Sequence, residues 1–141
     1  MSNSNISIAT DIVLERSNNG RPEILLIERK NPPFKTHWAL PGGFVEEDEE
    51  IASAAVRELM EETDIKLGRD LLQFIDYFDA PDRDPRGRIV SMAFGHVLQA
   101  PAEVSGNSDA ARAQWFSMDE LPELAFDHRT IIARWEERPK S

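Results

Sequence analysis

The sequence predicts one α/β or α+β domain in which mixed strands surround one or two helices. The length of 141 residues fits one ordinary domain, and 40% hydrophobic with 30% charged residues is typical of a folded chain. Strand-like patterns recur along the chain, and one long segment lacks both Gly and Pro. We therefore expect residues 1–141 to form a single domain.

The strand candidates are apolar segments bounded by turn signals. Asn18-Asn19-Gly20 is the kind of turn that closes a β-hairpin, so the first two candidates should pair. A charged loop separates the third candidate from the fourth. The candidates are the segments 6–14, 23–28, 71–78, 89–98 and 114–116.

Helical signals occur at four places. The segment 50–62 contains neither Gly nor Pro and has apolar residues at helical spacing, and 130–137 predicts a closing helix. Ser117 with Glu120 three residues later resembles a capping box and so predicts a helix start. Asp127-His128 is interpreted as a further helix-start element.

Composition excludes several functions. The 26 acidic against 16 basic residues give a net charge of −10, so we expect neither nucleic acid nor an anionic membrane as a partner. The absence of Cys from the sequence excludes disulfides, thiolate nucleophiles and Cys-ligated zinc. The N-terminus lacks a signal-peptide pattern, and no apolar run approaches the roughly 20 residues of a membrane span, so we expect a cytoplasmic protein.

Three glutamates of the central helix form an acidic stripe. Glu58, Glu61 and Glu62 stand at i, i+3 and i+4, beside the apolar stripe that would pack on a sheet. Their mutual repulsion and the macrodipole both oppose this arrangement near a helix C-terminus. A hard divalent cation such as Mg²⁺ would reverse both penalties.

The alternative is a solvated acidic face, which is the usual role of a charge run. The surroundings of the stripe favour the cation site. Gly42 and Gly43 let the backbone approach a ligand closely just before the helix. Arg57 is able to hold a neighbouring carboxylate through a bidentate pair.

These residues resemble the signature box of the Nudix hydrolases, which hydrolyse a nucleoside diphosphate linked to another group. The 23-residue box is Gly43, five residues, Glu49, seven residues and Arg57-Glu58-Leu59-Met60-Glu61-Glu62-Thr63-Asp64-Ile65. One position departs, because the family usually has Gly where this chain has Asp64. Asp tolerates the left-handed conformation that the helix end needs there.

The resemblance implies an α/β/α sandwich with a central mixed sheet and a loop–helix–loop catalytic box. It also implies a requirement for Mg²⁺, with Mn²⁺ as the alternative. Glu49 and Arg57 would pair and connect the loop to the helix. The implied catalytic residues are Glu49, Arg57, Glu61 and Glu62, and the implied metal ligands are the Gly42 carbonyl, Glu58, Glu61 and Glu62.

The flanking segments resemble the ADP-ribose pyrophosphatase branch of the family. The resembling segments are 38–45, 83–88, 109–110, 115–116 and 126–128. Arg83, Arg86 and Arg88 form a dense basic patch suited to bidentate phosphate recognition. The alternative is a solvated loop whose charges pair internally with Asp82 and Asp84.

Two further substrate contacts are weaker candidates. Arg29 is a second phosphate contact or plain surface, and Trp38 stacks an adenine or packs in the core. The general base stays open between Glu61 and two residues of the later loop, Glu103 and Asp109.

The resemblance implies hydrolysis of ADP-ribose to AMP and ribose 5-phosphate through a metal-activated water. Other nucleoside diphosphate sugars, dinucleoside polyphosphates and nucleoside triphosphates are alternative substrates. A non-catalytic sensor of ADP-ribose is an alternative of another class. Relatives in this branch are often homodimers, so the resemblance also allows a homodimer.

Overall fold

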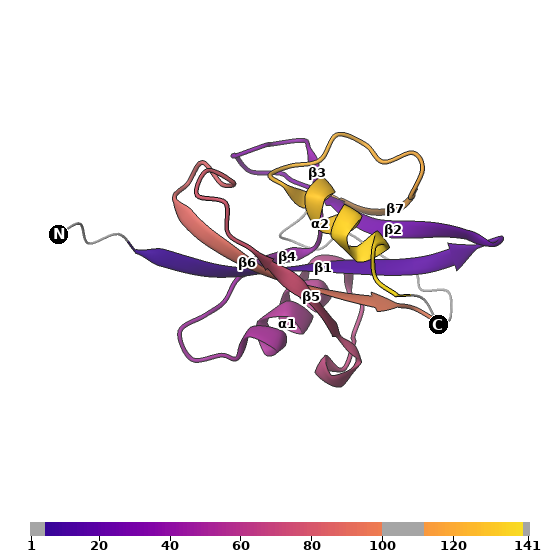
Figure 1. Cartoon of the computed structure of the whole chain (residues 1–141), viewed down its shortest axis with the longest axis horizontal. Coiled ribbons are helices and arrows are strands. Elements are labelled where there is room, and N and C mark those ends of the chain that lie inside the picture. Colours follow the sequence, from indigo (N-terminus) through magenta and orange to yellow (C-terminus); the bar gives the residue numbers. More distant parts are fainter. Residues whose placement is uncertain (1–4, 100–111, 140–141) are drawn as a thin grey trace.

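The computed structural model describes residues 5–99 and 112–139. Its centre is a seven-stranded mixed sheet of order β3-β2-β1-β6-β5, in which β4 also pairs with β1 and β7 with β2. Figure 1 shows the arrangement of these elements. The elements are β1 (Ile6–Asn18), β2 (Arg21–Glu28), β3 (Trp38–Ala39), β4 (Gly42–Phe44), α1 (Ile51–Thr63), the 3₁₀ turn η1 (Arg69–Leu71), β5 (Gln73–Phe78), β6 (Arg88–Val97), β7 (Arg112–Ser117) and α2 (His128–Glu136).

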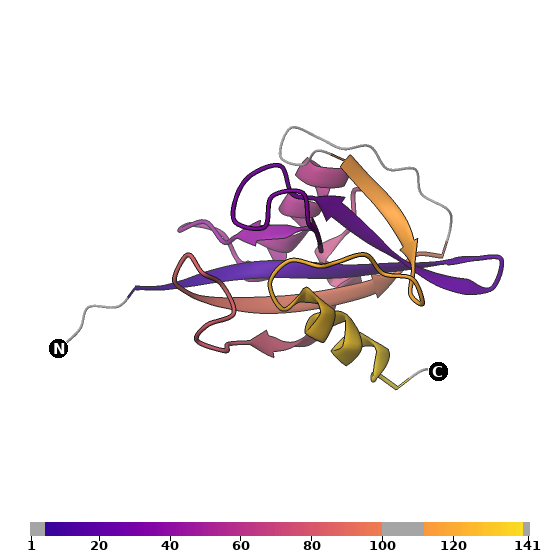
Figure 2. The same ribbon diagram turned by 90° about the horizontal axis from the view of Figure 1, so that it is seen from above.

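The hairpin of β1 and β2 confirms the turn prediction. Asn19 and Gly20 both have positive φ, 53° and 80°, and Asn18 pairs with Arg21 across the turn. Two consecutive left-handed residues match the right-handed twist of the strands that they connect. The hairpin tip lies at one end of the molecule (Figure 2).

The central strand β1 is buried on both faces. It pairs in parallel with β6 from Ile6 opposite Arg88 to Glu15 opposite Val97. Ile12 and Leu14 belong to the core on the α1 side, whereas Val13 belongs to the core on the α2 side. A strand covered on both faces has a continuous apolar run instead of alternation.

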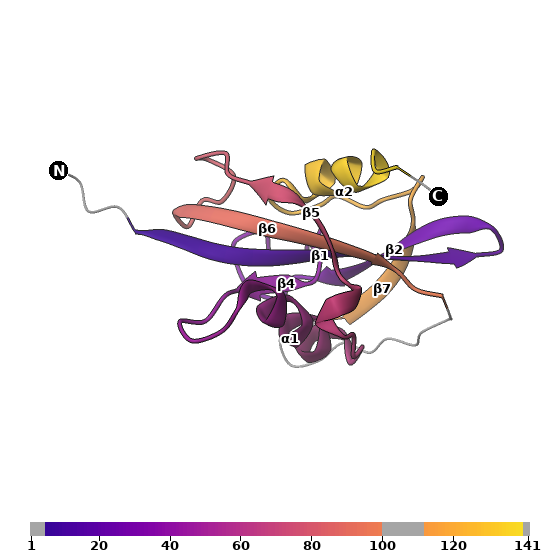
Figure 3. The ribbon, with the colours of Figure 1, turned by 60° about the horizontal axis from the view of Figure 1, so that its bottom comes forward.

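The two helices cover opposite faces of the sheet (Figure 3), so the predicted α/β/α sandwich is confirmed. α1 packs Ala55 and Leu59 on one face, and α2 packs Ile131, Ile132 and Trp135 on the other. Both helices match the predicted segments within a few residues. Among residues 5–99 and 112–139, no helix has the length and apolar character needed to cross a bilayer.

The helix start predicted at Ser117 is wrong. The amide of Glu120 donates to the Ser117 carbonyl over 3.0 Å and that of Asp119 to Ser117 Oγ over 3.3 Å, which forms a single turn at the end of β7. Pro122 follows two residues after Glu120, and a helix that began at Ser117 could not continue through it because proline lacks the amide donor.

Candidate active site

Two of the three stripe glutamates lie against the glycines of β4. Glu62 is 5% exposed, and its Oε1 accepts a 2.8 Å hydrogen bond from the Gly42 amide. A Cβ added to Gly43 would lie 2.5–2.7 Å from the carboxylate atoms of Glu58. Only a residue without a side chain leaves room for this contact, so the two glycines bring the strand backbone directly against both carboxylates.

The helix ends as the sequence predicts. Asp64 is left-handed, with φ 63° and ψ 14°, and its amide donates to the Met60 carbonyl. Thr63 Oγ1 donates to the Leu59 carbonyl over 2.6 Å. The departure from Gly at position 64 therefore keeps the helix end that presents the carboxylates.

Arg57 connects the loop before the helix to the acidic stripe. Its Nε and Nη2 donate to the two carboxylate oxygens of Glu49 over 3.0 and 2.7 Å, which is the predicted pair. Its Nη1 donates to Glu58 over 2.8 Å and to Glu61 over 3.2 Å. The hydrogen bonds from Arg57 lower the pKa of Glu49 to about 2, and the bonds to Glu49 raise the pKa of Arg57.

The chemistry of the acidic stripe fits a hard divalent cation. Three carboxylates within the last two turns of one helix supply the oxygen ligands that Mg²⁺ and Mn²⁺ prefer. In the part of the chain that the structure describes, no three acidic or histidine side chains converge around a common point. Instead, Arg57 donates hydrogen bonds to Glu58 and Glu61, and the Gly42 amide donates one to Glu62. A cation would therefore compete with Arg57 for Glu58 and Glu61.

A cleft opens beside this helix end, with a cavity volume of about 110 Å³. β1 contributes three lining residues, Ala9, Thr10 and Asp11, and Gly42 and Glu62 line the cleft together with basic residues of distant segments. The charged side chains that line it are Asp11, Arg29, Glu62, Arg83, Asp84 and Arg86. Of the three stripe glutamates Glu62 lines the cleft and Glu58 and Glu61 do not, so part of the predicted carboxylate site and part of the predicted basic patch are brought together.

Arg83 lines the cleft but is engaged in a buried ion pair. Its side chain is 3% exposed, and its Nε and Nη2 donate to both oxygens of Asp127 over 2.9 and 2.6 Å. Burial lowers the pKa of Arg83, but Asp127 outweighs this and the pKa is raised. Arg83 thus connects the basic loop to the start of α2.

Arg86 is the accessible arginine of the cleft. It is 40% exposed, pairs with Asp84 over 2.8 Å, and lies over the rings of Phe44 and Phe126 at 4.9 and 5.4 Å. Burial raises the pKa of Asp84, but the hydrogen bonds and charge of Arg86 outweigh it and the pKa is lowered. A solvent-accessible cation near two aromatic faces is suited to an anionic ligand that carries an aromatic base.

The remaining predicted residues divide between cleft and core. Arg29 lines the cleft and lies 5.0 Å from the Phe126 ring, and burial lowers its pKa. Trp38 packs in the core at 4.8 Å from Phe116, which matches the alternative interpretation of that residue. Arg88 donates to the Asp79 carbonyl and does not line the cleft. Glu103 and Asp109 lie outside the described residues.

Sequence reasoning missed a buried polar group at the cleft, two members of which, Asp11 and His128, line it. Asp11, Ser91 and His128 are 7%, 0% and 4% exposed, and Asp11 contacts both of the others. The sequence does contain one indication of this group, because Asp11 interrupts the apolar pattern of a central strand. The partners come from three distant segments, so spacing alone does not reveal the contact.

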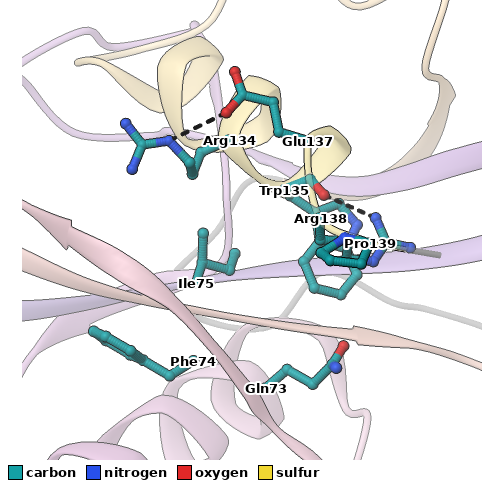
Figure 4. Close-up of a pocket in the computed structure, with 8 residues that line it drawn as sticks. All are labelled: Gln73, Phe74, Ile75, Arg134, Trp135, Glu137, Arg138 and Pro139. Carbon is teal, nitrogen blue, oxygen red and sulfur yellow. Dashed lines mark hydrogen bonds and ion pairs between the residues drawn. The ribbon is translucent and has the colours of Figure 1, made fainter.

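A second cavity, of about 560 Å³, lies between β5 and the end of α2 (Figure 4). Ile75 and Trp135 line it, and the Arg138 guanidinium stacks on the Trp135 ring at 3.6 Å. Arg134 pairs with Glu137 at its edge over 3.6 Å. None of the residues predicted for the site lines this cavity.

Comparison with known proteins agrees with this geometry. The chain is 43% identical to an ADP-ribose pyrophosphatase of Methanocaldococcus jannaschii over 92% of this chain and 74% of that protein. The NUDIX domain of Shewanella oneidensis NrtR, solved with ADP ribose, has a TM-score of 0.88 and 26% identity over 95% of this chain and 88% of that one.

A third relative is a larger protein. The bifunctional NMN adenylyltransferase/ADP ribose pyrophosphatase of Francisella tularensis, solved with AMP and a Mn ion, has a TM-score of 0.84 and 34% identity. The match covers 95% of this chain and 42% of that one. The NUDIX domain model matches residues 6–135, which include the acidic stripe, its glycine strand and the cleft. The chain therefore belongs to the Nudix family of hydrolases.

Proposed function

We propose that the chain hydrolyses the pyrophosphate bond of ADP-ribose, giving AMP and ribose 5-phosphate, with Mg²⁺ as the metal. The observation that carries the proposal is that Glu62 and Gly42 share one cleft with Arg29 and Arg86. Carboxylates for a cation beside guanidinium groups for phosphate are what an enzyme acting on a diphosphate needs. The identity to the Methanocaldococcus jannaschii pyrophosphatase supports ADP-ribose as the substrate.

Nudix hydrolases generally depend on a divalent metal. Its ligands here would be Glu58, Glu61, Glu62 and the Gly42 carbonyl. The bound cation supplies Lewis acidity and lowers the pKa of a coordinated water. Glu49 and Arg57 hold the loop on the helix, which keeps the ligands oriented.

The substrate would bind across the cleft through its charges and its base. Arg86 and Arg29 neutralise the pyrophosphate and offset the charge of the leaving phosphate. The Phe44 and Phe126 rings, which now contact Arg86, offer faces on which an adenine can stack. Among the open candidates for the general base, Glu61 has a side chain that is 42% exposed and so accessible to water, and Glu103 and Asp109 stay predictions.

A non-catalytic sensor of ADP-ribose is the second candidate, supported by the similarity to the NrtR domain. The two functions differ in what the carboxylates do. An enzyme needs the charge of Glu62 for turnover, whereas a sensor needs only to bind the ligand. Substitution of this residue separates the two.

Product analysis tests the proposal. The purified chain is incubated with Mg²⁺ or Mn²⁺ and ADP-ribose, another nucleoside diphosphate sugar, a dinucleoside polyphosphate or an oxidised nucleoside triphosphate. We expect ADP-ribose to be cleaved fastest, AMP to be released, and a chelator to stop the reaction. Faster cleavage of another member would refute the substrate, and binding of ADP-ribose without cleavage would favour the sensor.

Two further expectations belong to the same proposal. We place the reaction in the cytoplasm because no apolar run of the sequence approaches the length of a membrane span, and fractionation of cells that make the protein tests this. A homodimer follows from the resemblance alone, and light scattering of the purified chain tests it.

A further inference from the structure

The buried polar group of Asp11, Ser91 and His128 contacts the backbone of the turn that precedes β4. The Leu40 amide donates to His128 Nδ1 over 3.0 Å, and His128 Nε2 lies 3.3 Å from Asp11 Oδ1. Ser91 Oγ donates to Asp11 Oδ2. Burying polar groups of this kind is costly unless they are paired, and each of these three has a partner.

These contacts determine the orientation of the His128 ring. Because Nδ1 accepts a hydrogen bond from a backbone amide, the neutral ring carries its hydrogen on Nε2. The Nε2 side of the ring faces Asp11, with 3.3 Å between Nε2 and Asp11 Oδ1. Asp11 is itself held within the sheet, opposite Gly42 of β4 and Ala93 of β6. The ring is therefore held on both sides.

The turn that His128 contacts is anchored at three consecutive residues by three different elements. The Leu40 amide bonds to α2, the Pro41 carbonyl accepts from the Ile12 amide of β1 over 2.9 Å, and the Gly42 amide bonds to Glu62 of α1. Since a peptide unit is planar, fixing the Pro41 carbonyl and the Gly42 amide fixes the plane of the bond between them. Leu40 is the point where this turn is held from the α2 side.

We propose that His128, oriented by Asp11, is a positioning residue for the reaction: it holds the turn 40–43 so that Gly42 presents its backbone correctly to Glu62. The inference rests on the proposed function. In this role His128 acts through the Leu40 amide; its side chain also lines the cleft, and a direct contact with the substrate would show as a raised KM in its variants. The competing interpretation is that the ring only fills space beside Phe126, whose ring centre is 5.3 Å away.

Two substitutions of His128 distinguish these roles because they predict opposite rank orders. His128→Asn keeps an acceptor oxygen near the position of Nδ1, whereas His128→Leu keeps the bulk and loses the acceptor. If the ring only fills space, Leu is tolerated better than Asn, since a buried amide left unpaired is costly. If the ring positions the turn, Asn retains more turnover than Leu.

The kinetic experiment uses ADP-ribose hydrolysis by the full chain. We expect His128→Leu to lower kcat by about 10–100-fold, the usual effect of losing a residue that orients a metal ligand, and to raise the Mg²⁺ concentration needed for half-maximal rate. KM for ADP-ribose should change little, and His128→Asn should recover most of kcat. The matched controls, His96→Leu and His96→Asn on β6, should leave all three quantities unchanged. A kcat for His128→Leu at or above that of His128→Asn would overturn the proposal.

Hydrogen exchange supplies a readout that does not depend on activity. Amides of the segment 38–44 should exchange faster in His128→Leu than in wild type and at nearly the wild-type rate in His128→Asn. Unchanged exchange in His128→Leu would overturn the positioning role. If wild type cleaves no substrate, the proposed function fails, and the exchange measurement still decides whether His128 holds the turn.

Discussion

Gly42 and Glu62 lie twenty residues apart in sequence and are joined by a 2.8 Å hydrogen bond from the Gly42 amide to Glu62 Oε1. The bond couples β4 to the last turn of α1. One carboxylate oxygen of Glu62 is oriented by a strand while the side chain is carried by a helix. The site therefore depends on the packing of two elements as much as on the glutamates themselves.

Replacing Glu62 with Gln should remove most turnover without unfolding the protein. The amide oxygen still accepts from Gly42, but the negative charge that a divalent cation needs is lost. We expect kcat to fall by more than about 100-fold, because replacing even a residue that only hydrogen-bonds a metal ligand typically lowers activity by about 10–100-fold. Steady-state kinetics and the Tm measure the effect, and Glu136→Gln on the exposed side of α2 is the control. Wild-type turnover in Glu62→Gln would contradict the metal-ligand role.

The two glycines of β4 should respond differently to Ala. At Gly42 the new Cβ would lie 2.0 Å from the Thr10 carbonyl oxygen, which cannot move without distorting β1. We expect Gly42→Ala to lower the free energy of unfolding by more than about 2 kcal/mol, as for other severe steric clashes. At Gly43 the obstacle is the flexible carboxylate of Glu58, so Gly43→Ala should stay folded and lose activity. Urea unfolding and kcat together test this pair, and a Gly42→Ala as stable as wild type would refute it.

The ion pair of Glu49 and Arg57 should raise the free energy of unfolding, and this contribution should be lost in acid. The pKa of Glu49 is lowered to about 2 from 4.5, so the charged form is stabilised by folding. This contribution is complete above pH 4.5 and is lost as the pH falls towards 2. The Tm difference between wild type and Glu49→Gln should therefore be largest at neutral pH and shrink through that window. The exposed Glu47→Gln should show no such window, and a pH-independent difference for Glu49→Gln would contradict the assignment.

Replacing Arg83 and Arg86 with Ala should have different effects on substrate binding. Arg83→Ala leaves Asp127 without its buried partner and should cost about 3 kcal/mol of unfolding free energy, the lower end for broken buried pairs. Arg86→Ala leaves Asp84, whose side chain is 2% exposed, without its partner and should also lower the free energy of unfolding, by up to about 3 kcal/mol. Unlike Arg83→Ala, it should also raise KM for ADP-ribose by about tenfold or more through loss of a charge-assisted hydrogen bond. The reverse pattern would assign substrate binding to Arg83.

What the sequence predicted correctly depends on local interactions. The Asn19-Gly20 turn and the helix end at Asp64 are decided by backbone preferences within a few residues, and both are present. The pair of Glu49 and Arg57 is also close in sequence, at eight residues. Ser117 shows the limit of a local motif, because Pro122 overrides the capping pattern.

What the sequence did not reveal depends on distant partners. Arg83 belongs to a basic patch by spacing, yet its partner Asp127 lies 44 residues away and makes it a structural residue. The contact of His128 with Leu40 spans 88 residues. Burial of this kind follows from the order of strands in the sheet, which the pattern of apolar residues does not encode.

The parallel pairing of β1 with β6 has a consequence for synthesis on the ribosome. β1 is made first, but the strand that covers its long edge is made after α1, and α2, which covers one face, comes last. Non-local pairings of this type fold slowly because a long loop must close before they form. A nascent chain that already contains the whole acidic stripe therefore still lacks a complete sheet to carry it. Metal binding and turnover should thus appear only after α2 has emerged from the ribosome, and not in step with the segment that bears the ligands.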